Sequence, residues 1–238
     1  MNDFYLNLIV QGALYGLLLF SVLTWVLIVG KGVQNWRLGR QDKTFSKKFW
    51  SASSLDAAAQ LEREAGPKSR IAAVGFDALY VTDATADIDL EHSWDRKELL
   101  ERHLRQQIQK EYASREAGLA VLASIGSTAP FVGLFGTVFG IIHALTAISK
   151  SASASIDVVA GPIGEALVAT GVGIAVAVPA VLAYNFYVRR LKVSALELDN
   201  FANDLLNLAQ MSGYRIARLT PVNRPQTTTH AAAQGAFA

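Results

Sequence analysis

One carboxylate lies inside an otherwise apolar stretch of the sequence. From Gly161 to Val188 the only charged side chain is that of Glu165. A charge at the centre of a lipid bilayer costs about 2.5–3.5 kcal/mol on insertion scales, and acids that are kept there usually serve a function. We therefore interpret Glu165 as a group that takes up and releases a proton. The alternative is a structural hydrogen-bond partner.

Two threonines are placed to accompany this acid. Thr137 lies 13 residues before Lys150, and Thr170 lies 13 residues after Asp157. On antiparallel helices both would sit about 20 Å below the outer surface, with Glu165 at about 12 Å. The three side chains would then form a polar lining for ion movement. For each threonine, a hydrogen bond to its own helix backbone is an equally good interpretation.

The remaining titratable groups offer less chemistry. His143 lies about 10 Å from the outer end of its segment and is a possible secondary site, although a neutral, packed histidine is the simpler interpretation. There is no cysteine, no metal-binding histidine spacing and no phosphate-binding G-x-x-x-x-G-K-[ST] loop. We therefore expect neither a metal, nor another cofactor, nor ATP-driven work. Without a visible nucleophile–base pair, an enzyme is the least favoured class.

Three long apolar segments must position these residues. The chain has 238 residues, 51% of them hydrophobic, and a mean hydropathy of +0.26. About 20 residues of helix cross a hydrocarbon core. The sequence thus predicts an all-α, polytopic membrane protein with three transmembrane helices. The predicted parts are an outer N-terminus 1–5, membrane helices 6–30, 117–149 and 158–188, a cytoplasmic helical region 31–116, an outer loop 150–157, a cytoplasmic helix 189–212 and a disordered tail 213–238.

The distribution of basic residues predicts the orientation. Cations follow the first segment from Lys31 to Lys48, and Arg189, Arg190 and Lys192 follow the third. Because such clusters stay on the cytoplasmic side, we expect the N-terminus outside and the C-terminus inside. The Arg189–Lys192 cluster is also a candidate contact for phospholipid headgroups, each cation contributing about 1 kcal/mol. A net charge of +2 does not favour nucleic acid as a partner.

Two membrane segments continue as cytoplasmic helices. Ser93 resembles an N-cap, and the stripe of Leu100, Leu104 and Ile108 predicts a helix after it. Because no strong helix breaker precedes the second segment, the pattern predicts one very long helix. The third segment keeps its helical spacing to Met211, with Gly213 as the stop, and the two extensions are expected to pack together.

Small residues predict close helix packing within the membrane. The second segment contains Gly133, Gly136 and Gly140, and the first contains Gly12-x-x-x-Gly16. Small side chains let helices approach closely in lipid, and the same patches favour packing between copies of the chain. Taken singly, each glycine is a weak signal.

The stretches "STAPFVGLFGTVFGI" and "GEALVATGVGIAVAVPAVLAYN" resemble the MotA/TolQ/ExbB proton channel family, and its ExbB-type members most. The resemblance implies a proton pathway through Glu165, Thr137 and Thr170. It also implies a homo-oligomeric ring, a pentamer in ExbB, around single-span ExbD helices in the bacterial inner membrane. ExbB passes the proton motive force through TonB to outer-membrane uptake of iron–siderophore complexes and vitamin B12.

Two alternatives remain open at this stage. A TolQ-type subunit would couple the same gradient to outer-membrane maintenance, and His143 is a feature shared with that type. A structural scaffold would use Glu165 only to hold helices together.

Overall fold

The computed structural model describes residues 3–61, 66–83, 90–150 and 156–214. Its helices are α1 Asp3–Trp50, α2 Leu55–Ala59, α3 Pro67–Asp83, α4 Leu90–Glu116, α5 Leu119–Lys150 and α6 Ile156–Met211. No strand occurs in these described ranges, which confirms the all-α prediction. The predicted tail, apart from its first two residues, and most of the predicted outer loop lie outside the described residues.

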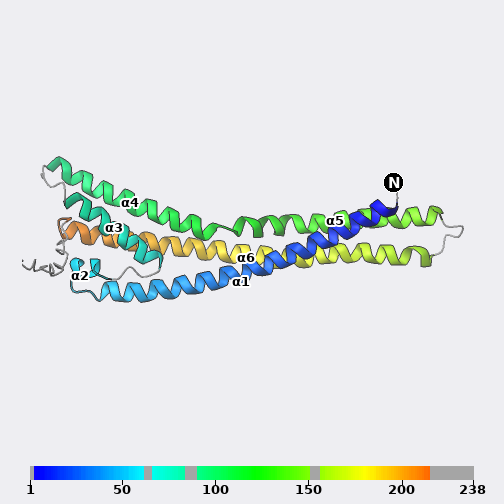
Figure 1. Ribbon diagram of the computed structural model, residues 1–238, viewed down its shortest axis with the longest axis horizontal. Helices are drawn as coiled ribbons and strands as arrows, with labels where there is room; N and C mark the ends of the chain where they lie inside the picture. The colour runs from blue at the N-terminus through cyan, green and yellow to red at the C-terminus, as the bar shows by residue number, and fades with distance from the viewer. Residues whose placement is uncertain (1–2, 62–65, 84–89, 151–155, 215–238) are drawn as a thin grey trace, which may run out of the picture.

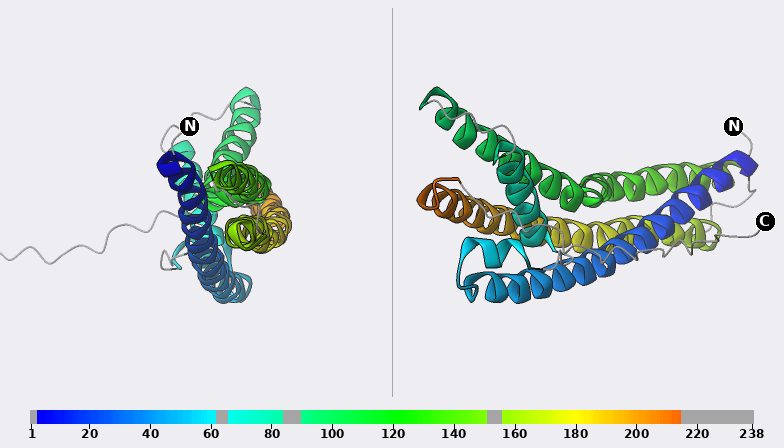
Figure 2. Two further views of the ribbon diagram at one scale, coloured as in Figure 1. Left: turned by 90° about the vertical axis from the view of Figure 1, so that its right-hand side faces the viewer. Right: turned by 60° about the vertical axis from the view of Figure 1, so that its left-hand side comes forward.

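Three rods form an elongated bundle (Figure 1). They are α1 with 48 residues, α4 followed by α5, and α6 with 56 residues. The end-on view in Figure 2 shows α1 lying obliquely across the α5–α6 pair. Each rod contains a helix long and apolar enough to cross a membrane. The three predicted membrane-crossing helices are therefore confirmed in length and composition.

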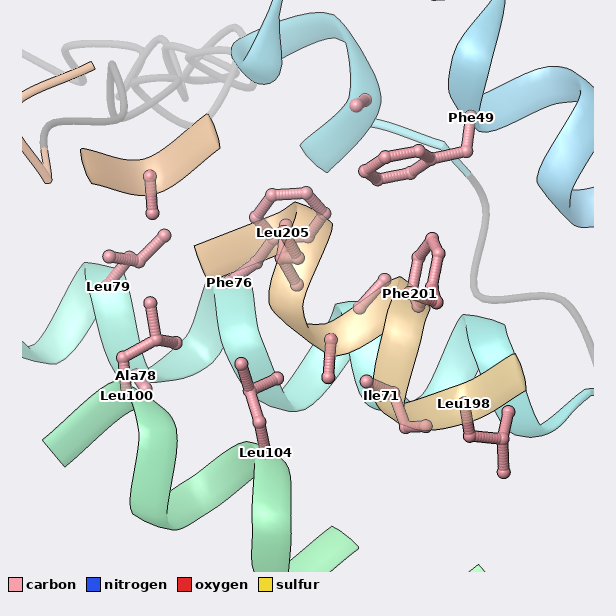
Figure 3. Packing of buried hydrophobic residues seen from close by; sticks show 14 of the residues in the cluster. Phe49, Ile71, Phe76, Ala78, Leu79, Leu100, Leu104, Leu198, Phe201 and Leu205 are labelled. Atoms are coloured by element: carbon pink, nitrogen blue, oxygen red, sulfur yellow. The ribbon is translucent and has the colours of Figure 1, made fainter. Parts of the chain in front are cut away.

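Buried hydrophobic residues form two separate clusters along the bundle. The first, here called the membrane core, joins α1, α5 and α6 through Leu17, Leu119, Leu122, Ile125, Ala129, Val176, Ala177, Ala180, Tyr187 and Leu191. The second lies where the sequence predicted the cytoplasmic region and is here called the cytoplasmic core; it joins all the helices except α5 (Figure 3). Phe49 of α1 meets Phe201 of α6 there, with ring centroids 5.1 Å apart. Leu100 and Leu104 of α4 face Leu205 of α6, which confirms that the two extensions pack together.

Polar contacts fasten α3 beside the cytoplasmic core. Asp42 of α1 accepts a hydrogen bond from the backbone N–H of Lys68 in the first turn of α3, at 3.0 Å. Arg70 of α3 donates two hydrogen bonds of 2.6 Å to Glu111 of α4. Burial disfavours the ionised form of Glu111, but the bonds from Arg70 and Gln107 outweigh burial and lower the pKa of Glu111.

The prediction of one unbroken helix through residue 116 was wrong. α4 ends at Glu116 and α5 begins at Leu119, with a turn at Ala117–Gly118 between them. Gly118 has a φ of +83°, in the left-handed region that glycine adopts at helix C-termini. The N-cap prediction was also wrong, because α4 begins at Leu90 and Ser93 lies within its first turn. The predicted end of α6 is confirmed at Met211, and Gly213 has a φ of +63°.

Candidate proton site and family

The structure brings the two predicted threonines together between α5 and α6. The Oγ1 of Thr170 donates to the Oγ1 of Thr137 at 3.4 Å, and the Oγ1 of Thr137 donates to the carbonyl oxygen of Leu134 at 2.7 Å. Thr137 thus makes the backbone bond of the structural alternative while also accepting from Thr170. Thr137 is buried, with 7% of its surface exposed. The residue count that placed both hydroxyls at one depth was correct.

Glycines make this meeting possible. A Cβ atom on Gly133 would lie 2.7 Å from the carbonyl oxygen of Ala169, and one on Gly173 would lie 2.7 Å from that of Ala129. Neither position has room for a methyl group, because the obstacle is backbone. The packing interpretation of Gly133 is therefore confirmed. By contrast, a Cβ atom on Gly12 or Gly16 would meet nothing within 4 Å, so this pair makes no close approach within the chain.

Glu165 points away from the threonine pair. It is exposed on α6, whereas the neighbouring Ala166 and Ala169 are buried. Five residues of α-helix separate Glu165 from Thr170, which corresponds to about 8 Å along the axis and about 140° around it. A single chain therefore exposes the carboxyl, buries Thr137 and leaves Thr170 half-buried beside it. Joining them in one pathway requires groups from outside the chain or water.

The other predicted site residues lie apart from this pair. His143 is half-buried on α5, three residues beyond Gly140, where an added Cβ atom would lie 2.5 Å from the Cβ of Ala166. Arg189, Arg190 and Lys192 are exposed on α6. The Arg190 guanidinium carbon lies 5.5 Å from the ring centroid of Phe186, within the range of a cation–π interaction. The cluster is thus free to meet headgroups on its exposed side.

Sequence reasoning missed a polar cluster at the break between α4 and α5. Lys31 donates to the carbonyl oxygen of Arg115 at 2.9 Å. Arg115 donates to Ser194 of α6 and, at 3.3 Å, to Asn35 of α1. Burial lowers the pKa of Arg115, and burial together with the neighbouring Arg115 charge lowers that of Lys31. A single arginine before an apolar segment indicates only the orientation of that segment in the membrane. Gly118 was therefore the only residue whose type could have indicated a break here.

A tyrosine strengthens the same level of the bundle. The hydroxyl of Tyr187 on α6 donates to the carbonyl oxygen of Ile28 on α1 at 2.7 Å.

Among the described residues, no group of three His, Cys, Asp or Glu side chains is arranged to hold a metal ion. The side chains described at the candidate site are the hydroxyls of Thr137 and Thr170 and the carboxyl of Glu165.

Comparison with known proteins gives this geometry a context. Residues 64–200 match the MotA/TolQ/ExbB proton channel family. The chain belongs to this family. A biopolymer transport protein ExbB of Neisseria meningitidis is 39% identical over 190 residues, covering 79% of this chain and 86% of the relative. The ExbB of Xanthomonas campestris is 35% identical over 79% of this chain and 77% of its own, and that of Salmonella typhimurium is 30% identical over 85% and 82%.

Membership of the family decides the broad class of function. These relatives support an ExbB-type role, because all three carry that name. Together with the three apolar helices, they support a multi-pass protein of the inner membrane. The family is one of proton channels. The resemblance seen in the sequence is confirmed.

Proposed function

We propose that this chain is the proton-channel subunit of an ExbB–ExbD–TonB motor that energises outer-membrane uptake. The observation that carries the proposal is the exposed carboxyl of Glu165 on a helix of membrane-spanning length, in a member of a proton channel family. Because an ionised acid facing lipid is costly, something other than lipid must cover Glu165 when it is charged. A neighbouring copy and an ExbD-like single-span helix are the candidates.

The exposed surface of the membrane half supports such an assembly. An apolar hollow of 570 Å³ lies between α1 and α5, lined by residues such as Gly12, Ala13, Phe131 and Phe135. Phe131 is 69% exposed, and the open face of Gly12 has no neighbour within the chain. We take this face as the site where a second copy packs in a homo-oligomeric ring, a pentamer by resemblance to ExbB. A TonB-like protein would then receive the work.

The proposed proton route begins at the outer end. A carboxyl that is neutral when protonated enters the membrane half at little cost, and it releases its proton when an acceptor approaches. We assign this role to Glu165, with an aspartate of the ExbD-like helix as the acceptor that the resemblance implies. Thr137 and Thr170, about 8 Å deeper, would pass the proton onward through bound water. His143 is a secondary group on the outer side.

The orientation and the lipid contacts belong to the same proposal. The N-terminus lies outside and the C-terminus inside, because basic residues are concentrated after α1 and α6 leave the membrane. Arg189, Arg190 and Lys192 then lie at the height of the inner headgroups and bind phospholipid. No nucleic acid and no cofactor are involved in this mechanism.

The test replaces Glu165 with glutamine. Glu165→Gln keeps the size and hydrogen bonding of the side chain but cannot titrate. We expect this variant to assemble with its partner and to lose gradient-driven uptake and proton flux into proteoliposomes. Asp204→Asn, the same change at an exposed position of α6 outside the membrane half, is the matched control and should be fully active. Full uptake by a normally expressed Glu165→Gln protein would leave Glu165 a packing residue of a structural scaffold.

A further inference from the structure

The break between α4 and α5 lies between the two cores of the bundle. α1 and α6 run unbroken through the membrane core and the cytoplasmic core, whereas the third rod is interrupted at Ala117–Gly118. The first hydrogen bond of α5, from the N–H of Leu122 to the carbonyl oxygen of Gly118, is long at 3.5 Å. Helix continuity therefore does not hold α5 to α4.

Side chains hold this junction instead. Lys31 of α1 donates to the carbonyl oxygen of Arg115 in the last turn of α4, where a cation is favoured by the helix dipole. The guanidinium of Arg115 reaches Asn35 of α1 with one terminal nitrogen and Ser194 of α6 with the other. One side chain thus ties the interrupted rod to both continuous rods.

Around the threonine pair, the α5–α6 interface is built from small residues. α5 and α6 touch there through glycine and alanine, as at Gly133 and Gly173. Such surfaces allow close approach but present low ridges, and interlocking ridges are what set the axial register of packed helices. A shift of one residue along the axis is about 1.5 Å, and a hydrogen bond of 3.4 Å between Thr170 and Thr137 does not survive it.

The spacing of the two contacts matches this requirement. Arg115 lies 22 residues before Thr137, and Ser194 lies 24 residues after Thr170. At about 1.5 Å per residue, the polar tie lies about 33–36 Å from the threonine pair along both antiparallel rods. Two contacts therefore depend on the same axial alignment of the two rods. They are the Arg115–Ser194 contact at the junction and the Thr137–Thr170 contact in the membrane half.

We propose that Arg115, supported by Lys31, is a positioning residue that sets the register of α5 against α6 and so holds Thr137 against Thr170. This inference rests on the proposed proton route. It assigns to the junction a role in the membrane half, although none of its side chains lies on that route.

The test compares variants of the complete chain, reconstituted with its partner. Arg115→Gln removes the fork, and Ser194→Ala removes only its acceptor on α6. Arg105→Gln is the control, because Arg105 is exposed on α4 and pairs with Glu101 one turn away. Hydrogen exchange of amides 117–122 reports on the junction, and proton flux in proteoliposomes reports on the pathway. Thermal stability and copy number report on general structure.

Loss of one net hydrogen bond should speed exchange at 117–122 about fivefold for Ser194→Ala, and more for Arg115→Gln, relative to the control. Proton flux should fall at unchanged copy number, while the melting temperature of Ser194→Ala falls by no more than the about 2–4 °C that about 1 kcal/mol implies for a chain of this size. If Arg115→Gln does not assemble, the exchange rate and proton flux of Ser194→Ala test the proposal by themselves. Exchange at the control rate would overturn the proposal, and so would faster exchange with unaltered flux. Glu165→Gln should leave junction exchange unchanged, so failure of the proton route is recognised separately.

Discussion

α5 and α6 touch backbone to backbone at Gly133, and a single added methyl group tests what this contact holds. In Gly133→Ala the new Cβ would lie 2.7 Å from the carbonyl oxygen of Ala169 and 3.0 Å from the Cα of Thr170. The first distance is about 0.7 Å shorter than the 3.4 Å at which ordinary van der Waals contact begins. Because both atoms belong to the backbone, the helices themselves must separate.

The cost follows from this displacement. Overpacking of a close-packed site typically costs about 1–3 kcal/mol, and about 2 kcal/mol lowers the melting temperature of a chain of this size by about 4–8 °C. The same separation stretches the Thr170–Thr137 hydrogen bond beyond its present 3.4 Å, which is already near the limit for such a bond. We therefore expect lower stability together with lower proton flux.

The assay is thermal unfolding of the purified complex, followed by flux measurements in proteoliposomes. The matched control is Gly171→Ala, next to Thr170 on α6, where a Cβ atom would meet nothing within 4 Å. Both changes gain the same helix propensity from alanine, so their difference isolates the clash. The packing argument would be refuted if the melting temperature of Gly133→Ala equalled or exceeded that of Gly171→Ala.

Three further outcomes are expected. Thr137→Val and Thr170→Val should each reduce proton flux less than Glu165→Gln while assembling normally, and flux equal to wild type in both would remove the hydroxyls from the route. Burial raises the pKa of Asp42, so its contribution to stability declines as the pH rises from the ordinary to the raised pKa. In unfolding measured from pH 4 to 8, Asp42→Asn should flatten this decline, whereas Asp42→Ala should cost about 1 kcal/mol through loss of the acceptor for Lys68. Gln at Arg189, Arg190 and Lys192 should reduce phospholipid co-purification measured by mass spectrometry, and unchanged lipid would leave the cluster a topology determinant only.

Local patterns sufficed to predict much of the molecule. Apolar length predicted three membrane-crossing helices, and residue counting predicted that Thr137 and Thr170 lie at one level on antiparallel helices, because an α-helix has a constant rise. The end of α6 followed from Gly213 for the same local reason. These features depend only on the chain close to them.

What escaped prediction depends on neighbours distant in the sequence. Gly118 breaks the third rod at a point where Lys31 and Arg115 replace the missing helix contacts, and no local pattern pairs residues 84 positions apart. The orientation of Glu165 was missed as well. A helix that is apolar nearly all round has no periodicity to indicate which side faces its own chain, so a residue count predicts the level of Glu165 along α6 but not the direction of its side chain.

The outward position of Glu165 also bears on how the chain enters the membrane and how long a lone copy lasts. In the proposed assembly a partner covers the carboxyl, but during insertion none does so yet, and the apolar residues from Leu167 to Val188 must supply the favourable transfer free energy of the segment. A newly inserted copy then differs from an assembled one by an acid facing lipid. We expect the lifetime of orphan subunits in the cell to depend on how fast this side chain is covered, which links the accumulation of this chain to the synthesis rate of its partner.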